Sequence, residues 1–100
     1  MPYAIITHDG PDSAAIRAEH GAAHRRYLDE NKARLIAAGA MLKDDATRPH
    51  GSIFILDTEE RAEAQAFLDG DPFSKAGLFV SSEITYWRKA FFDFERLIDL

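Results

Sequence analysis

Short apolar, β-branched runs alternate along the chain with alanine-rich and polar segments. Residues 3–8 (Tyr-Ala-Ile-Ile-Thr-His) stop at residues 9–11 (Asp-Gly-Pro), which is typical of a strand that ends in a turn. Residues 52–56 give the clearest strand pattern, and their apolar side chains on both faces favour a central, covered position in a sheet. Residues 40–43 predict a weaker strand, and the alternation over residues 83–89 predicts a fourth.

The segments between these strands predict two helices. Residues 11–19 fit a loop or a short helical turn, and a long helix is expected over about residues 21–38. Leu28 and Leu35 stand seven residues apart on one face of that helix, and Gly39 suits its C-cap position. Most of the connection between the first and second predicted strands should therefore be helical.

A second helix is predicted over about residues 59–68, with Asp57 or Thr58 as its cap. The side chains expected to point inward from it are Ala62, Ala66 and Phe67. Residues 72–76 then predict one further helical turn, which Gly77 would close.

The resulting order, β-α-β-β-α-β, predicts an α+β fold: an antiparallel sheet with both helices on one face. A chain of 100 residues has room for a single domain, residues 1–100. Residues 90–100 form a tail with too much aromatic surface to leave in water, so it should pack on the domain or on a partner. Because one sheet face would also stay open, we expect a homodimer that pairs two such faces.

Composition narrows the possible partners. The net charge is −5, and the basic residues are scattered, with only two adjacent pairs, Arg25-Arg26 and Arg88-Lys89, so no cationic face for nucleic acid is expected. No apolar run approaches the roughly 20 residues that span a bilayer, so no membrane attachment is expected. The chain contains no cysteine, which excludes thiol chemistry and fits a cytoplasmic location.

His24 is the most informative single residue. Helical spacing places it on the face of Leu28, at the rim of the layer between sheet and helix, where clefts for small ligands form. The plainer alternative is a helix histidine that is partly buried and merely hydrogen-bonded. His20 lies one turn away, but two ligands are too few for a metal site and no further motif completes one, so no metal or cofactor is expected.

Asp71 also has two interpretations. Asp followed by Pro is the usual start of a helical turn, because the carboxylate accepts orphan amide hydrogens and proline has none to offer. The functional alternative is that the carboxylate orients an imidazole, which fixes the proton on one ring nitrogen and leaves the other free to accept one.

Taken in order, several segments resemble the YCII-related family over residues 3–92. They are the strand ending at residues 8–9, the segment from Arg17 through residues 23–28 (Ala-His-Arg-Arg-Tyr-Leu), the Asp-Gly-Asp-Pro-Phe run at residues 69–73 and the closing strand. The resemblance implies a ferredoxin-like fold that dimerises into an α+β barrel. It also implies activity on small, often aromatic ring compounds, of the lyase, isomerase or dehalogenase type.

The same resemblance implies an active site built on a His–Asp pair, which corresponds to His24 and Asp71. The residues expected to line the same cleft are His8, Arg17, Ser52 and Phe73.

Three functional hypotheses follow. The first is an enzyme in which His24 transfers a proton as general acid or base, Asp71 fixes its tautomer, and Arg17 holds a substrate carboxylate or enolate. The second is a dimeric module that binds or senses a small molecule without turnover. The third is a purely structural interaction domain, which would have no enclosed pocket near the first helix.

Overall fold

Four antiparallel strands form one sheet in the computed structural model, which describes residues 1–100. The strands are β1 (Tyr3–Asp9), β2 (Leu35–Leu42), β3 (Pro49–Leu56) and β4 (Phe79–Tyr86). The helices are α1 (Ser13–Glu30), α2 (Arg61–Gly70) and the short α3 (Pro72–Lys75). The sheet order is β2-β3-β1-β4, so the predicted ferredoxin-like α+β topology is confirmed, with α3 added after α2.

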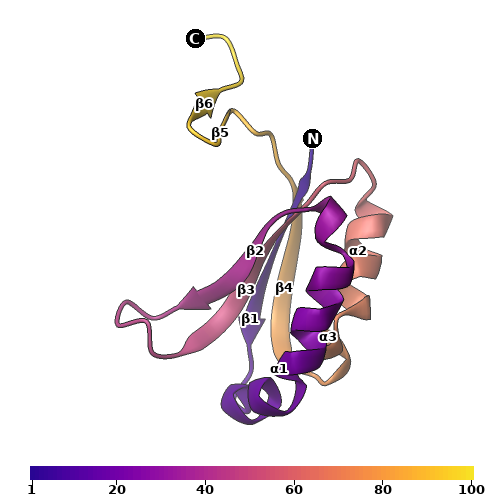
Figure 1. Ribbon diagram of the computed structural model, residues 1–100, viewed down its shortest axis with the longest axis vertical. Coiled ribbons are helices and arrows are strands. Elements are labelled where there is room, and N and C mark those ends of the chain that lie inside the picture. The colour runs from indigo at the N-terminus through magenta and orange to yellow at the C-terminus, as the bar shows by residue number, and fades with distance from the viewer.

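The helices cover one face of the sheet only. Figure 1 shows α1 and α2 packed on the same side, with the other side of the sheet uncovered and the C-terminal segment extending away from it. No helix is long and apolar enough to cross a membrane. Successive side chains of a strand point to opposite faces of the sheet, so some apolar side chains lie on the uncovered face. Ile53 is one of them and is partly exposed.

The core lies between the two central strands and α2. Ile5 pairs with Phe54 and Tyr3 with Leu56 across the β1–β3 ladder, so all four side chains share the face toward the helices. Phe67 of α2 contacts the edge of the Phe54 ring, with ring centroids 5.7 Å apart. Full burial of a side chain of this size contributes roughly 1.5–3 kcal/mol, so this contact fixes α2 on the sheet.

The first helix differs from the prediction in both its limits. Helix α1 begins at Ser13 and ends at Glu30, because the Asn31 amide side chain donates to the Tyr27 carbonyl and caps the last turn. After a 3-10 turn, Leu35 begins β2, so the seven-residue spacing from Leu28 is not a helical stripe and Gly39 is not a C-cap. Pairing with β3 outweighs the helix propensity of this alanine-rich segment.

The second helix also departs in detail. Phe67 is buried as predicted, but Ala62 and Ala66 are exposed, because the buried face is the one formed by Ala64, Phe67 and Leu68 at i, i+3, i+4 spacing. Neither expected cap is the N-cap of α2, which is Glu60; the Thr58 hydroxyl instead stabilises the preceding turn, where it accepts from the Glu60 amide at 3.1 Å and donates to Glu63.

Residues 90–100 do not pack on the sheet or the helices. Strands β5 (Phe91–Phe92) and β6 (Glu95–Arg96) pair as a small hairpin, seen at the top of Figure 1. Phe94, at the turn of this hairpin, is fully exposed. Of the two predicted positions for the tail, packing on its own domain is therefore wrong. Strand β4 likewise begins earlier than predicted and ends before Trp87.

One glycine permits a close approach of two strands. A Cβ on Gly51 would collide with the Thr7 carbonyl oxygen of β1 and with the end of the Met41 side chain, whereas a Cβ on Gly39 would meet nothing within 4 Å. We expect Gly51→Ala to lower the free energy of unfolding by about 1–3 kcal/mol, and Gly39→Ala to leave it nearly unchanged. Urea unfolding of both variants measures the difference, and equal stabilities would contradict this account.

Candidate active site

His24 and Asp71 form a hydrogen-bonded pair between α1 and the start of α3. The His24 Nδ1 atom lies 2.8 Å from one carboxylate oxygen of Asp71 and 3.0 Å from the other. The Asp71 side chain is fully buried and the His24 side chain is 12% exposed. Because a buried carboxylate loses its hydration, a close donor such as this imidazole strongly stabilises it.

The backbone explains why Asp71 faces inward. Asp71 is the N-cap of α3, and its Oδ1 accepts from the Phe73 amide at 2.9 Å. Pro72 occupies the first helical position, where no amide donor is required. The two interpretations of Asp71 are therefore compatible, since one carboxylate caps α3 and contacts the imidazole together.

Aromatic rings fix the plane of the imidazole. The Phe73 ring stacks on His24 with centroids 4.1 Å apart and planes 18° apart. Phe54 approaches from the sheet, edge-on, at 6.3 Å. With Nδ1 occupied by Asp71, Nε2 is the ring nitrogen of His24 that has no partner within the protein. The arrangement presents that atom to any molecule that occupies the space beside it.

A cavity of about 380 Å³ lies beside this pair. It is bounded by α1, β2, β3 and α3, and among its lining residues are His24, Arg17, Ser52, Phe54 and Phe73. The structure therefore brings five of the six sequence-predicted site residues to one place: four at the cavity wall and Asp71 directly behind His24. This volume suits a small ring compound.

His8 is the exception. It is exposed on β1, next to the fully buried Thr7, whose side chain faces the helices. Since successive side chains of a strand point to opposite faces, His8 lies on the uncovered face of the sheet and not at the cavity wall. The sequence alone did not show to which face of the sheet a histidine at the end of this strand would point.

Arg17 lies at the cavity wall with most of its donors occupied. Its Nε and Nη2 bind the Asp9 carboxylate at 2.8 and 3.2 Å, and Nη2 also donates to the Gly51 carbonyl at 3.2 Å. Its guanidinium lies 5.2 Å from the centroid of the Phe73 ring. Arg17 of α1 therefore connects β1, through Asp9, and β3, through Gly51, around the site. The sequence alone did not indicate that Asp9 and Gly51 are its partners.

Two buried hydroxyls lie near the floor of the site. Ser52 is almost fully buried and lines the cavity, where its hydroxyl can meet a polar group of a ligand or water. Thr7, its cross-strand neighbour on β1, has a buried hydroxyl without a hydrogen-bond partner but does not line the cavity. An unpaired buried hydroxyl is costly to the fold.

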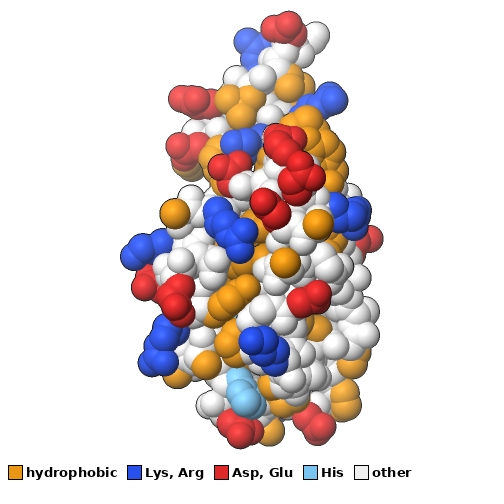
Figure 2. All heavy atoms as spheres, turned by 90° about the vertical axis from the view of Figure 1, so that its right-hand side faces the viewer, with side chains coloured by type: hydrophobic (Ala, Val, Ile, Leu, Met, Phe, Trp, Pro, Cys, Tyr) orange, Lys and Arg blue, Asp and Glu red, His pale blue; other side chains and the backbone are white.

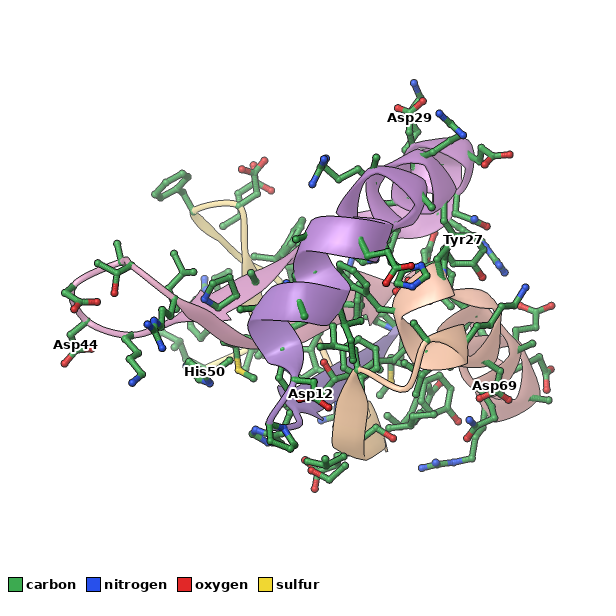
Figure 3. The ribbon with its side chains drawn as sticks, turned by 90° about the horizontal axis from the view of Figure 1, so that it is seen from below. Asp12, Tyr27, Asp29, Asp44, His50 and Asp69 are labelled. Carbon is green, nitrogen blue, oxygen red and sulfur yellow. The ribbon has the colours of Figure 1, made fainter.

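Tyr27 closes the site on the side away from the cavity. It lies where α1 meets α2 and α3 (Figure 3), and its hydroxyl donates to the Phe67 carbonyl at 2.8 Å. Burial raises the pKa of Tyr27, the Asp71 carboxylate adds to the rise, and the Arg34 guanidinium opposes it. Tyr27 thus stays a neutral donor.

No group of three or more histidine, aspartate or glutamate side chains is arranged to hold a metal ion. His20, one turn before His24 on α1, is partly exposed and lies 3.7 Å from the Glu19 carboxylate. The lining residues that the sequence analysis did not predict as site residues are Gly21, Arg25, Leu28, Gly39, Ala40, Pro49 and Phe54. Gly39 was predicted as the C-cap of the first helix, whereas Ala40 was correctly predicted to lie in a strand.

Known proteins resemble this chain in sequence and in fold. The family model of the YCII-related domain matches residues 1–88. Two curated relatives, both called Protein YciI, come from Escherichia coli O6:H1 and Shigella flexneri; each is 33% identical over 98 residues, which is 91% of this chain and 100% of the relative.

A solved structure is also similar. It is 5-chloro-2-hydroxyhydroquinone dehydrochlorinase (TftG) from Burkholderia phenoliruptrix in complex with 2,5-dihydroxybenzoquinone, with a TM-score of 0.80 and 34% identity. The match covers 88% of this chain and 94% of that one. With a family model that spans most of the chain and relatives of this identity, the protein belongs to the YCII-related family.

Proposed function

We propose that this protein is an enzyme that removes a proton from a small ring compound, with His24 as the general base and Asp71 as its positioning residue. The observation that carries the proposal is the buried hydrogen bond between His24 Nδ1 and Asp71 at the wall of a ring-sized cavity. The name of the similar dehydrochlorinase and its bound quinone support chemistry on a small molecule in this family.

The hydrogen bond decides which nitrogen reacts. An ionised carboxylate only accepts, so Asp71 holds the imidazole proton on Nδ1 and leaves the lone pair on Nε2. When Nε2 takes a proton, the positive charge of the imidazolium lies 2.8 Å from a buried anion, which stabilises it. The stacked Phe73 ring prevents the imidazole from turning away.

The reaction class that fits is elimination from a ring. Nε2 of His24 takes a proton from a ring hydroxyl or ring carbon, the electron pair of that bond forms a new double bond, and a leaving group such as chloride departs with its own electrons. The imidazolium then returns its proton to water. If the imidazolium instead returns the proton to a different atom of the same ring, no leaving group departs and the product is an isomer. Every group that these transfers require is a side chain of this chain.

We further propose that the protein works as a homodimer. On the uncovered sheet face, Ile6 of β1 lies directly opposite Ile53 of β3, and Ile53 is 43% exposed in one chain. A second copy would remove this apolar face from water and close the barrel. Residues 90–100, which find no contact on their own domain, would then lie on the partner.

Substitution of the imidazole tests the catalytic proposal. We expect His24→Asn to lower the rate of chloride release from 5-chloro-2-hydroxyhydroquinone by about 10²–10⁴-fold, because the base is lost while the cavity stays. Asp71→Asn should lower it as well, since an amide keeps the cap on the Phe73 amide but no longer enforces the tautomer. Chloride release is followed with an ion-selective electrode.

His20→Asn is the matched control, since it changes an exposed histidine on the same helix, one turn away. It should react at the rate of the unchanged protein. Equal rates for His24→Asn and the control would contradict the proposal. A protein that binds the ring compound but never turns it over would instead be the non-catalytic binding module.

Light scattering after size exclusion tests the assembly. We expect a mass of twice the 11.2 kDa chain for the unchanged protein, and a shift toward the single-chain mass for Ile53→Asp, because a carboxylate would be buried in the apolar interface. Ala62→Asp, on the exposed side of α2, should remain dimeric. Deletion of residues 90–100 should weaken the dimer, and single-chain mass for the unchanged protein would refute the proposal.

A further inference from the structure

A second cavity adjoins the first. It has a volume of about 490 Å³ and lies between the start of α1 and the hairpin that joins β2 to β3. Arg17 and Pro49 line both cavities, so the two are neighbours on either side of the Arg17 side chain. The hairpin side of the second cavity is formed by Lys43, Thr47 and Arg48. Nothing in the proposed proton transfer uses these residues.

The two cavities are lined by cations and by no carboxylate. The basic side chains among their lining residues are Arg17, Arg25, Lys43 and Arg48, and neither lining includes an aspartate or a glutamate. Arg17 is already paired with Asp9, whereas Lys43 and Arg48 have no ion-pair partner. The Lys43 amide donates to the Arg48 carbonyl at 3.2 Å, which holds these two residues opposite each other across the hairpin.

The surroundings make this local charge unusual. The chain carries a net charge of −5, and Figure 2 shows acidic side chains gathered on the α2 side of the molecule. The acidic residues near the second cavity are not among its lining residues, although Asp12 lies between the lining residues Pro11 and Ser13, and Asp9 accepts hydrogen bonds from the lining residues Ser13 and Arg17. Asp44 lies at the outer end of the hairpin (Figure 3), and the Asp45 carboxylate accepts from the Thr47 hydroxyl and amide, bonds that lower the pKa of Asp45.

The start of α1 adds to the same field. Ser13 and Ala14 line the second cavity from the first turn of α1, and that turn contains no acidic residue. The unpaired amides of a helix N-terminus carry a partial positive charge. An anionic group in this cavity would therefore face two cationic side chains without ion-pair partners, Lys43 and Arg48, and a helix N-terminus whose partial charge the Asp12 N-cap offsets in part.

We propose that the second cavity binds an anionic substituent of the substrate, with Lys43 and Arg48 as its ligands, while the ring occupies the cavity beside His24. The inference rests on the proposed function and narrows it to ring compounds that carry a carboxylate or a comparable anionic group. Arg17, whose donors bind Asp9 and Gly51, forms the wall between the two parts rather than the anion site.

A matched pair of probes separates charge from shape. 2,5-Dihydroxybenzoate and 2,5-dihydroxybenzamide have the same ring and nearly the same size, and only the first is an anion at pH 7. We expect calorimetric titration to give about tenfold tighter binding of the benzoate, since two exposed ion pairs each contribute modestly. The preference should diminish as salt is added.

The Lys43→Ala/Arg48→Ala double variant should bind both probes with the same affinity. Arg26→Ala/Lys75→Ala is the control, because it removes two exposed basic side chains that line neither cavity and changes the net charge equally. The control should retain the preference. Equal binding of both probes by the unchanged protein, absence of benzoate binding, or equal loss in both double variants would overturn the proposal.

These outcomes are separable from the test of His24. Chloride release depends on the imidazole and is measured as a rate, whereas the anion preference is measured as a ratio of affinities without turnover. A protein that loses activity in His24→Asn but shows no preference for the benzoate would retain the proposed chemistry and reject the anion site.

Discussion

The buried carboxylate of Asp71 is the constraint on which the site depends. It is removed from water, so it requires donors, and the two it has are the Phe73 amide and the His24 imidazole. The first donor fixes the start of α3, and the second fixes α3 against α1. The packing of α3 against α1 and the positioning of the His24 imidazole therefore depend on the same carboxylate. Loss of either donor would leave the buried charge of Asp71 with fewer hydrogen bonds, which is costly.

Much of the framework could be predicted from local patterns. Strand β1 and the second half of β3 follow from apolar runs ended by turn residues, and the Asp71-Pro72 pair identifies the start of α3. These features are local, because a strand run or a cap is encoded within a few residues. The placement of His24 on α1 was predictable for the same reason, although its meeting with Asp71 depends on how two helices pack.

The remaining errors have a common physical cause, which is tertiary contact. Residues 35–38 have good helix formers and were predicted as helix, yet they begin strand β2, which pairs with β3. Arg17 was expected to hold a substrate, but a partner eight residues earlier, Asp9, becomes available only when the end of β1 lies beside α1. The position of His8 depends on the parity of β1, which neighbouring strands determine.

The contrast between the two cavities bears on how such a protein can diversify. Phe73 belongs at once to the core of α3, to the stack on His24 and to the contact with Arg17, so a change there disturbs folding and chemistry together. Residues 43–48 are exposed and connect two strands whose register is set elsewhere. Selection could therefore exchange side chains in the hairpin and change the surface of the second cavity while the His24–Asp71 pair is inherited intact.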